Sequence, residues 1–83
     1  MKALMIHLNG KKLCLAGIAS GVQASIGPLG EDASEYSMDV YGCDLLTRNV
    51  FLWPGAKLET GDQVTIALVE VDEADPPEIL EDS

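Results

Sequence analysis

Few side chains in this 83-residue sequence are of types that could carry out covalent or metal chemistry: one histidine, His7, and two cysteines, Cys14 and Cys43. A cysteine beside a histidine could act as a nucleophile, because the imidazole would accept the thiol proton. The three side chains and one carboxylate would also supply four metal ligands, but neither the CxxC nor the HxxxH spacing of metal sites is present. We therefore expect no metal and no cofactor, with His7 an ordinary strand residue.

The other motifs of catalysis are missing from the sequence as well. The glycines between residues 17 and 30 precede no GK[ST] and form no dinucleotide fingerprint, and no GxSxG is present. General acid–base work would need paired carboxylates in a low-dielectric setting. The candidates for such a pair fall among expected turn and surface residues: Asp39, Asp44, Glu59 and Asp62. The sequence therefore favours a protein that is not an enzyme.

The negative charge is concentrated near the C-terminal end. The chain has 14 acidic and 5 basic residues, a net charge of −9, and residues 70–83 contain seven acids and no base. Such a field repels nucleic acid and anionic membranes, and it attracts a basic protein. The apolar stretch after Lys2 is interrupted by His7 and Asn9-Gly10, so we recognise no secretory leader. We expect a cytoplasmic protein with reduced thiols, or a Cys14–Cys43 disulfide if the chain is exported.

The segment MIHLNGKKLCL, residues 5–15, has the pattern of a β-hairpin. Asn9-Gly10 suits a two-residue turn, because both residues tolerate positive φ. Regular pairing from that turn would place Ile6 opposite Leu13, and Met5 opposite Cys14. The expected core face is then Leu4, Ile6, Leu8, Leu13 and Leu15.

Further short strands follow at spacings of about ten residues, over 21–26, 36–41, 49–53 and 63–71. The last is apolar on both faces, which predicts a central strand. No long segment has the 3.6-residue period of a helix. The sequence predicts an all-β fold, a small antiparallel sandwich or barrel of five to six short strands. The compact domain should cover residues 1–72, with an acidic, proline-containing tail over 73–83.

Two segments resemble parts of the β-grasp sulfur-carrier proteins. IHLNGKKL, residues 6–13, resembles their first hairpin, and LETGDQVTIALVEV, residues 58–71, resembles their last strand, entered through a Gly-Asp turn. The resemblance implies a β-grasp-like α+β fold as the alternative. The carriers place a helix where this chain has GVQASIGPLG, and they end in a reactive Gly-Gly where this chain ends in Leu-Glu-Asp-Ser. The carrier chemistry is therefore not implied.

By elimination, the sequence predicts a non-catalytic acidic protein that acts by protein–protein binding. An inhibitor or immunity-type protein of a basic partner fits this description, since acidic surfaces accelerate encounter with basic ones. The alternative is a structural, self-assembling subunit, with a homodimer formed through an edge strand. The expected partner-binding residues are four aromatic side chains as anchors and four acids that attract the partner: Tyr36, Tyr41, Phe51, Trp53, Glu70, Asp72, Glu73 and Asp75.

Overall fold

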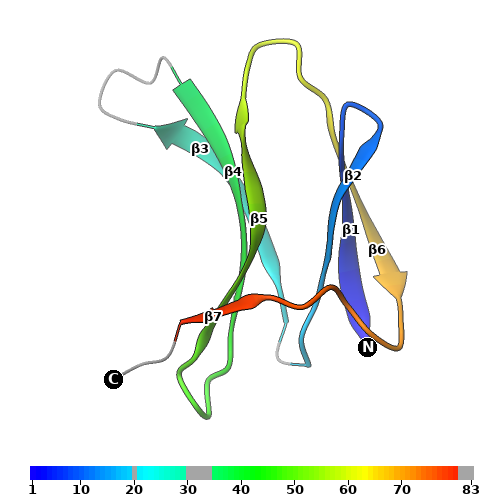
Figure 1. Ribbon diagram of the computed structural model, residues 1–83, viewed down its shortest axis with the longest axis vertical. Helices are drawn as coiled ribbons and strands as arrows, with labels where there is room; N and C mark the ends of the chain where they lie inside the picture. The colour runs from blue at the N-terminus through cyan, green and yellow to red at the C-terminus, as the bar shows by residue number, and fades with distance from the viewer. Residues whose placement is uncertain (20, 30–34, 81–83) are drawn as a thin grey trace.

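The computed structural model describes residues 1–19, 21–29 and 35–80, and these form an all-β fold without a helix (Figure 1). Within those ranges the strands are β1 (Lys2–Leu8), β2 (Lys11–Ala16), β3 (Gln23–Leu29), β4 (Glu35–Cys43), β5 (Val50–Leu58), β6 (Val64–Glu70) and β7 (Glu78–Leu80). They build two antiparallel sheets, with strand orders β2-β1-β6 and β3-β4-β5-β7.

The all-β, antiparallel prediction is confirmed, and the two sheets do not close into a barrel. The β-grasp-like alternative is wrong. The segment expected to hold its helix forms β3, which pairs along its whole length with β4. None of the described residues belongs to a helix long and apolar enough to cross a membrane.

The first hairpin forms as predicted at its tip but changes register farther along. Asn9 and Gly10 have φ values of 52° and 83°, and Leu8 pairs with Lys11 as expected. A β-bulge then shifts the pairing, so that Ile6 lies opposite Cys14. A shift of one residue exchanges the two faces of a strand.

The shifted register changes which side chains of β2 reach the core. Cys14 and Ala16 are fully buried, whereas Leu13 and Leu15 are only half-buried. The predicted core face was therefore right for Ile6 and wrong for β2. We call the face that carries Ile6, Cys14 and Ala16 the core face of the three-stranded sheet.

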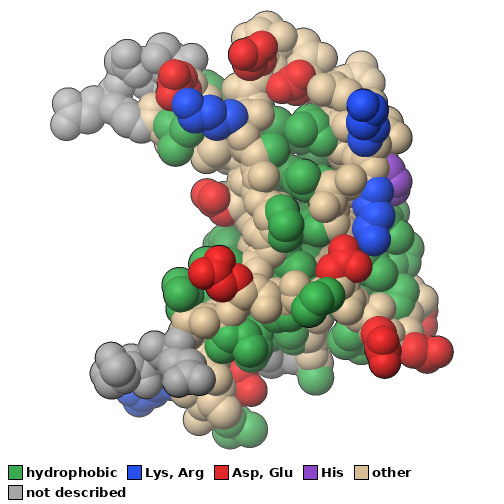
Figure 2. All heavy atoms as spheres, in the orientation of Figure 1, with side chains coloured by type: hydrophobic (Ala, Val, Ile, Leu, Met, Phe, Trp, Pro, Cys, Tyr) green, Lys and Arg blue, Asp and Glu red, His purple; other side chains and the backbone are tan. Residues whose placement is uncertain are grey.

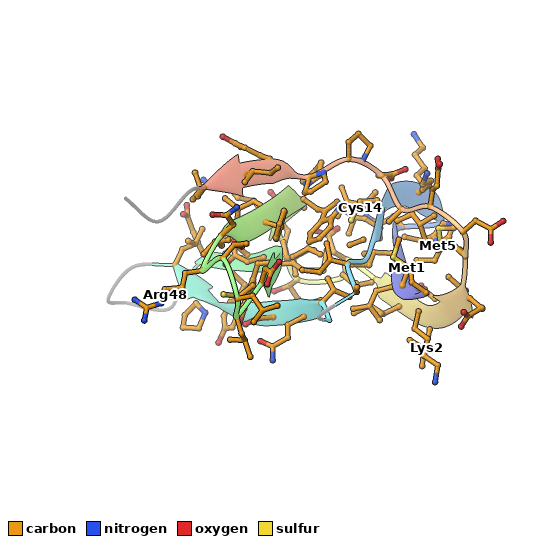
Figure 3. The ribbon with its side chains drawn as sticks, turned by 90° about the horizontal axis from the view of Figure 1, so that it is seen from below. Met1, Lys2, Met5, Cys14 and Arg48 are labelled. Carbon is orange, nitrogen blue, oxygen red and sulfur yellow. The ribbon has the colours of Figure 1, made fainter. Side chains whose placement is uncertain are left out.

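The buried core is small and joins the two sheets where β2 lies near β5. Its large members within the described ranges are Ile6, Met38, Val40 and Trp53, each contributing about 1.5–3 kcal/mol by burial. Figure 3 shows Cys14 between β2 and the four-stranded sheet, whereas Lys2 points away from the body of the molecule. Strands farther from the β2–β5 contact leave apolar side chains uncovered.

A second β-bulge lies at Pro54-Gly55 of β5, where β4 shifts register on β5 between Met38 and Val40. A Cβ atom added to Gly55 would overlap the backbone carbonyl oxygen of Met38. Glycine is therefore required here by the close approach of the two backbones.

Residues 71–77, which we call the strap, connect the two sheets. Val71 exchanges backbone hydrogen bonds with Met1, at 2.9 and 2.8 Å. The N–H of Asp75 donates to the carbonyl of Leu15 at 2.8 Å, and its own carbonyl accepts from Nε1 of Trp53 at 2.8 Å. Beyond the strap, β7 pairs with β5. The segment expected to be an acidic tail is thus part of the folded sheet structure up to Leu80; residues 81–83 lie outside the described residues.

Candidate protein-binding surface

The side chains of Ile66 and Leu68 form an exposed apolar patch on the core face of β6. Ile66 lies opposite Ile6, and Leu68 lies opposite Leu4, so all four side chains project from the same side of the sheet. Ile6 is fully buried, but Ile66 is 44% exposed and Leu68 is 68% exposed. The core face is therefore covered near β2 and uncovered at β6.

The strand β6 lies at an edge of its sheet, so the prediction that it is central was wrong. The sequence 64–69 is VTIALV, without a charge, a proline or a glycine. Soluble proteins usually protect such edges with charges, bulges or covering segments. An uncharged edge of this length is typical of a strand that pairs with a further strand.

The hydrogen bonds at both ends of β6 show which backbone groups face its open edge. Val71 exchanges two bonds with Met1, and the N–H of Asn9 donates to the carbonyl of Gln63 at 2.8 Å. Hydrogen-bonded and non-hydrogen-bonded pairs alternate along an antiparallel ladder. The backbone N–H and C=O groups of residues 65, 67 and 69 therefore form the hydrogen bonds to β1. The N–H and C=O groups that point toward the open edge belong to Val64, Ile66, Leu68 and Glu70.

A groove of about 770 Å³ lies at the start of β6, beside the middle of β3, the start of β4 and the end of β5. Its apolar lining includes Ile26, which is 53% exposed, and Tyr36, which is 45% exposed. The groove reaches β6 at Val64, and on the other sheet it includes Ile26 of the outer strand β3. Its apolar and charged lining residues are Ile26, Tyr36, Leu58, Val64, Glu35, Lys57, Glu59 and Asp62.

Carboxylates lie at both ends of β6. Glu59 and Asp62 occupy the turn before the strand, and Asp72 and Glu73 are exposed in the strap after it. Figure 2 shows acidic side chains at the top, over the loop from β5 to β6, and at the lower right, over the turn that follows β6. The apolar strand is thus bordered by negative charge on both sides.

The turn before β6 is fixed by the carboxylate of Asp62. It accepts hydrogen bonds from the backbone N–H of Glu59 at 2.8 Å and from Nδ2 of Asn9 at 3.1 Å. These two bonds stabilise the ionised form and lower the pKa of Asp62. The negative charge at this end of β6 is therefore present at neutral pH.

The four aromatic side chains predicted as anchors lie at separate places. Trp53 is only 5% exposed and bonds to the strap, so it is part of the core and presents no surface to a partner. Phe51 is half-buried against the core. Tyr41 follows the buried Val40, so it projects from the face of its sheet that points away from the core, where it is half-buried beside Leu52. Tyr36 is the predicted aromatic residue that the structure places at the groove.

The four acids predicted to attract a partner also differ in their surroundings. Glu70 is exposed and lies opposite Lys2 on β1, and Asp72 and Glu73 are exposed. Asp75 has a structural role, since its carboxylate accepts from the backbone N–H of Leu15 at 2.8 Å. That bond, helped by Lys12 at 3.3 Å, lowers the pKa of Asp75.

The side chains that could act as a nucleophile, a base or a metal ligand are not brought together. Cys14 is on the core face, opposite Ile6, whereas His7 is the next residue along β1 and projects from the other face. Burial raises the pKa of the Cys14 thiol, and the charge of Asp75 acts in the same direction. Cys43 is exposed on β4, and no disulfide joins it to the buried Cys14. No three potential metal ligands cluster within residues 1–19, 21–29 and 35–80.

Sequence reasoning missed Ile66, Leu68 and Ile26 as surface residues. The signal was present for β6, because an apolar strand on both faces is either central or an unprotected edge. Which of these holds depends on the strand order, and this order is set by long-range pairing.

No protein family model matches this chain, and no curated protein or solved structure matches it either. Function must therefore be argued from the surface itself.

Proposed function

We propose that this chain is a non-catalytic binding protein that recognises a basic protein partner, as an inhibitor or immunity-type protein would. The observation that carries the proposal is the exposed apolar patch of Ile66 and Leu68 on an uncharged edge strand. Apolar patches that remain exposed on a folded domain commonly mark sites of protein association. The two sheets, arranged as an open antiparallel sandwich, would serve as the rigid scaffold that presents this patch.

The charge supports a basic partner. The chain carries −9 overall, and acids stand at both ends of the patch. Complementary charge raises the association rate and excludes acidic competitors, and the effect weakens as salt screens it. Burial of the Leu68 side chain in the complex would supply affinity that salt does not remove.

The test is a pull-down of the tagged protein from its own cell extract at low and high salt, read by mass spectrometry. We expect one basic protein, enriched at low salt and depleted at high salt. Leu68→Ser should weaken its binding about tenfold or more, as at a buried interface residue. Leu46→Ser is the matched control, because Leu46 is a 95% exposed leucine in a turn away from β6.

Recovery of a basic protein that binds Leu68→Ser as well as wild type would contradict the use of this patch. Recovery of no partner, or of an acidic one, would contradict the proposed function. The second candidate is a self-assembling structural subunit, which the open edge of β6 also favours. Sedimentation analysis would then show a mass that rises with protein concentration.

A further inference from the structure

The open edge of β6 suggests how the partner proposed above would bind. The backbone N–H and C=O groups of Val64, Ile66, Leu68 and Glu70 face this edge. A strand laid along it would form main-chain hydrogen bonds with these groups, which is the recognition mode called β-strand addition. At about 3.4 Å per residue, the seven residues of β6 offer an edge roughly 20 Å long.

The side chains of β6 define the centre of the added strand. Alternate residues of that strand would lie beside Ile66 and Leu68 on the core face, where they would cover part of the exposed apolar surface. The other face of β6 presents Thr65, Ala67 and Val69, which are small or apolar. The complementary segment therefore has an uncharged centre with apolar residues at every second position.

The charges at the ends of β6 define the ends of the added strand. Glu59 and Asp62 precede the strand, and Asp72 and Glu73 follow it. Lysine or arginine at both ends of the added segment would lie near these carboxylates. Opposite charges on neighbouring strands stabilise the pairing, and like charges destabilise it.

The same charges argue against a second copy of this chain as the occupant. Antiparallel pairing of two β6 strands about Ala67 would bring the acids that follow β6 in one copy beside the acids that precede it in the other. Both ends of such an interface would then carry like charges, in addition to the net −9 of each copy. A basic segment meets no such repulsion.

We infer that the open edge of β6 accepts an extended segment of a basic protein, with alternating apolar residues at its centre and basic residues at both ends. This inference rests on the proposed function and adds its geometry. It also assigns a role to the absence of charge in residues 64–69, which otherwise leaves an edge strand unprotected.

The probe is a synthetic peptide with a Val-Thr-Val-Thr-Val centre and two lysines at each end, and hydrogen exchange read by NMR is the measurement. In the free protein we expect fast exchange at the amides of residues 66, 68 and 70 and slow exchange at 65, 67 and 69. The peptide should slow the first set about tenfold or more. A peptide with glutamates in place of the lysines is the charge control and should leave exchange unchanged.

Leu68→Pro removes an outward N–H without removing a bond to β1, and proline is tolerated at such edge positions. It should abolish the protection, whereas Leu68→Ala, which keeps the N–H but removes the apolar side chain, should weaken the protection without abolishing it. If Leu68→Pro does not fold, the peptide pair on the wild-type protein decides alone.

Three results would overturn the inference. The first is that the lysine peptide leaves exchange unchanged or slows it outside β6. The second is that the glutamate peptide slows exchange equally well. The third is protection that grows with protein concentration when no peptide is present, which would show that a second copy occupies the edge. Failure of the peptide test with a Leu68-dependent basic partner in the pull-down would leave the proposed function standing and remove only strand addition.

Discussion

Nε1 of Trp53 donates a hydrogen bond of 2.8 Å to the backbone carbonyl of Asp75. Trp53 belongs to β5 of the four-stranded sheet, and Asp75 is bonded through its N–H and its carboxylate to Leu15 of β2. Three segments that are distant in the sequence thus meet at one residue of the strap. The contact between the two sheets depends on this junction as well as on the small apolar core.

Replacement of Trp53 by Phe should destabilise the fold by about 2 kcal/mol, because the carbonyl of Asp75 would lose its partner and the smaller ring would leave a void. Urea unfolding followed by circular dichroism measures the loss. Tyr41→Phe is the control, since Tyr41 is half-buried on the other face of its sheet, and it should change the unfolding free energy much less. Equal effects of the two changes would contradict the role of the junction.

The charge of Asp75 should make stability depend on pH in the acid range. The hydrogen bond from Leu15 lowers the pKa of Asp75 below its ordinary 3.8, so the folded state binds the proton less well than the unfolded state. The stabilisation is therefore present above pH 3.8 and is lost as the pH falls through the lower pKa of the folded state. Asp75→Asn should unfold at lower urea concentration at pH 7 and lose less stability on acidification.

The pKa of Asp62 is also lowered, by the hydrogen bonds that its carboxylate accepts from Glu59 and Asn9 in the turn before β6. Asp62→Asn is therefore compared with Asp75→Asn and wild type, and the unfolding of all three is measured between pH 2 and pH 7. An acid-induced loss of stability unchanged in Asp75→Asn would show that the Leu15 contact does not contribute.

Replacement of Gly55 by Ala should destabilise the protein by about 2 kcal/mol or more, since the added methyl group overlaps the carbonyl of Met38. Thermal unfolding measures the effect. Gly27→Ala in β3 is the matched control, because a Cβ atom there meets no atom within 4 Å. It should be neutral or slightly stabilising, as alanine loses less backbone entropy than glycine on folding. If Gly55→Ala left the stability unchanged, the backbones of β4 and β5 would be able to move apart at the bulge without loss of free energy of unfolding.

The two cysteines should react with a thiol reagent at very different rates. Cys43 is exposed, whereas Cys14 is buried and has a raised pKa, so little thiolate is available and access requires opening of the fold. Labelling with a chromogenic disulfide at pH 8 should modify Cys14 at least about a hundredfold more slowly than Cys43. Urea should remove the difference, and comparable rates without urea would contradict the burial of Cys14. The variants Cys14→Ala and Cys43→Ala assign the two phases.

The all-β class and the tip of the first hairpin follow from local sequence. Asn9-Gly10 tolerates the positive φ values that a two-residue turn requires, and the alternation of apolar residues in 36–41 matches the buried Met38 and Val40 of β4. The absence of a helical period correctly predicted that the described residues form no helix. These features depend on neighbouring residues, so the sequence alone was sufficient for them.

The tertiary structure alone decided the bulge in the first hairpin, the position of β6 and the role of Asp75. The bulge exchanges the faces of β2, so that Cys14 and Ala16 are buried in the core and Leu13 is only partly buried against it. The apolar pattern of β6 fits a central strand and an open edge equally well, and no local signal distinguishes them. Pairing between strands is a long-range choice among segments of similar propensity. The free energy of the whole arrangement therefore determines which strand stays at the edge and which acid becomes part of the core junction.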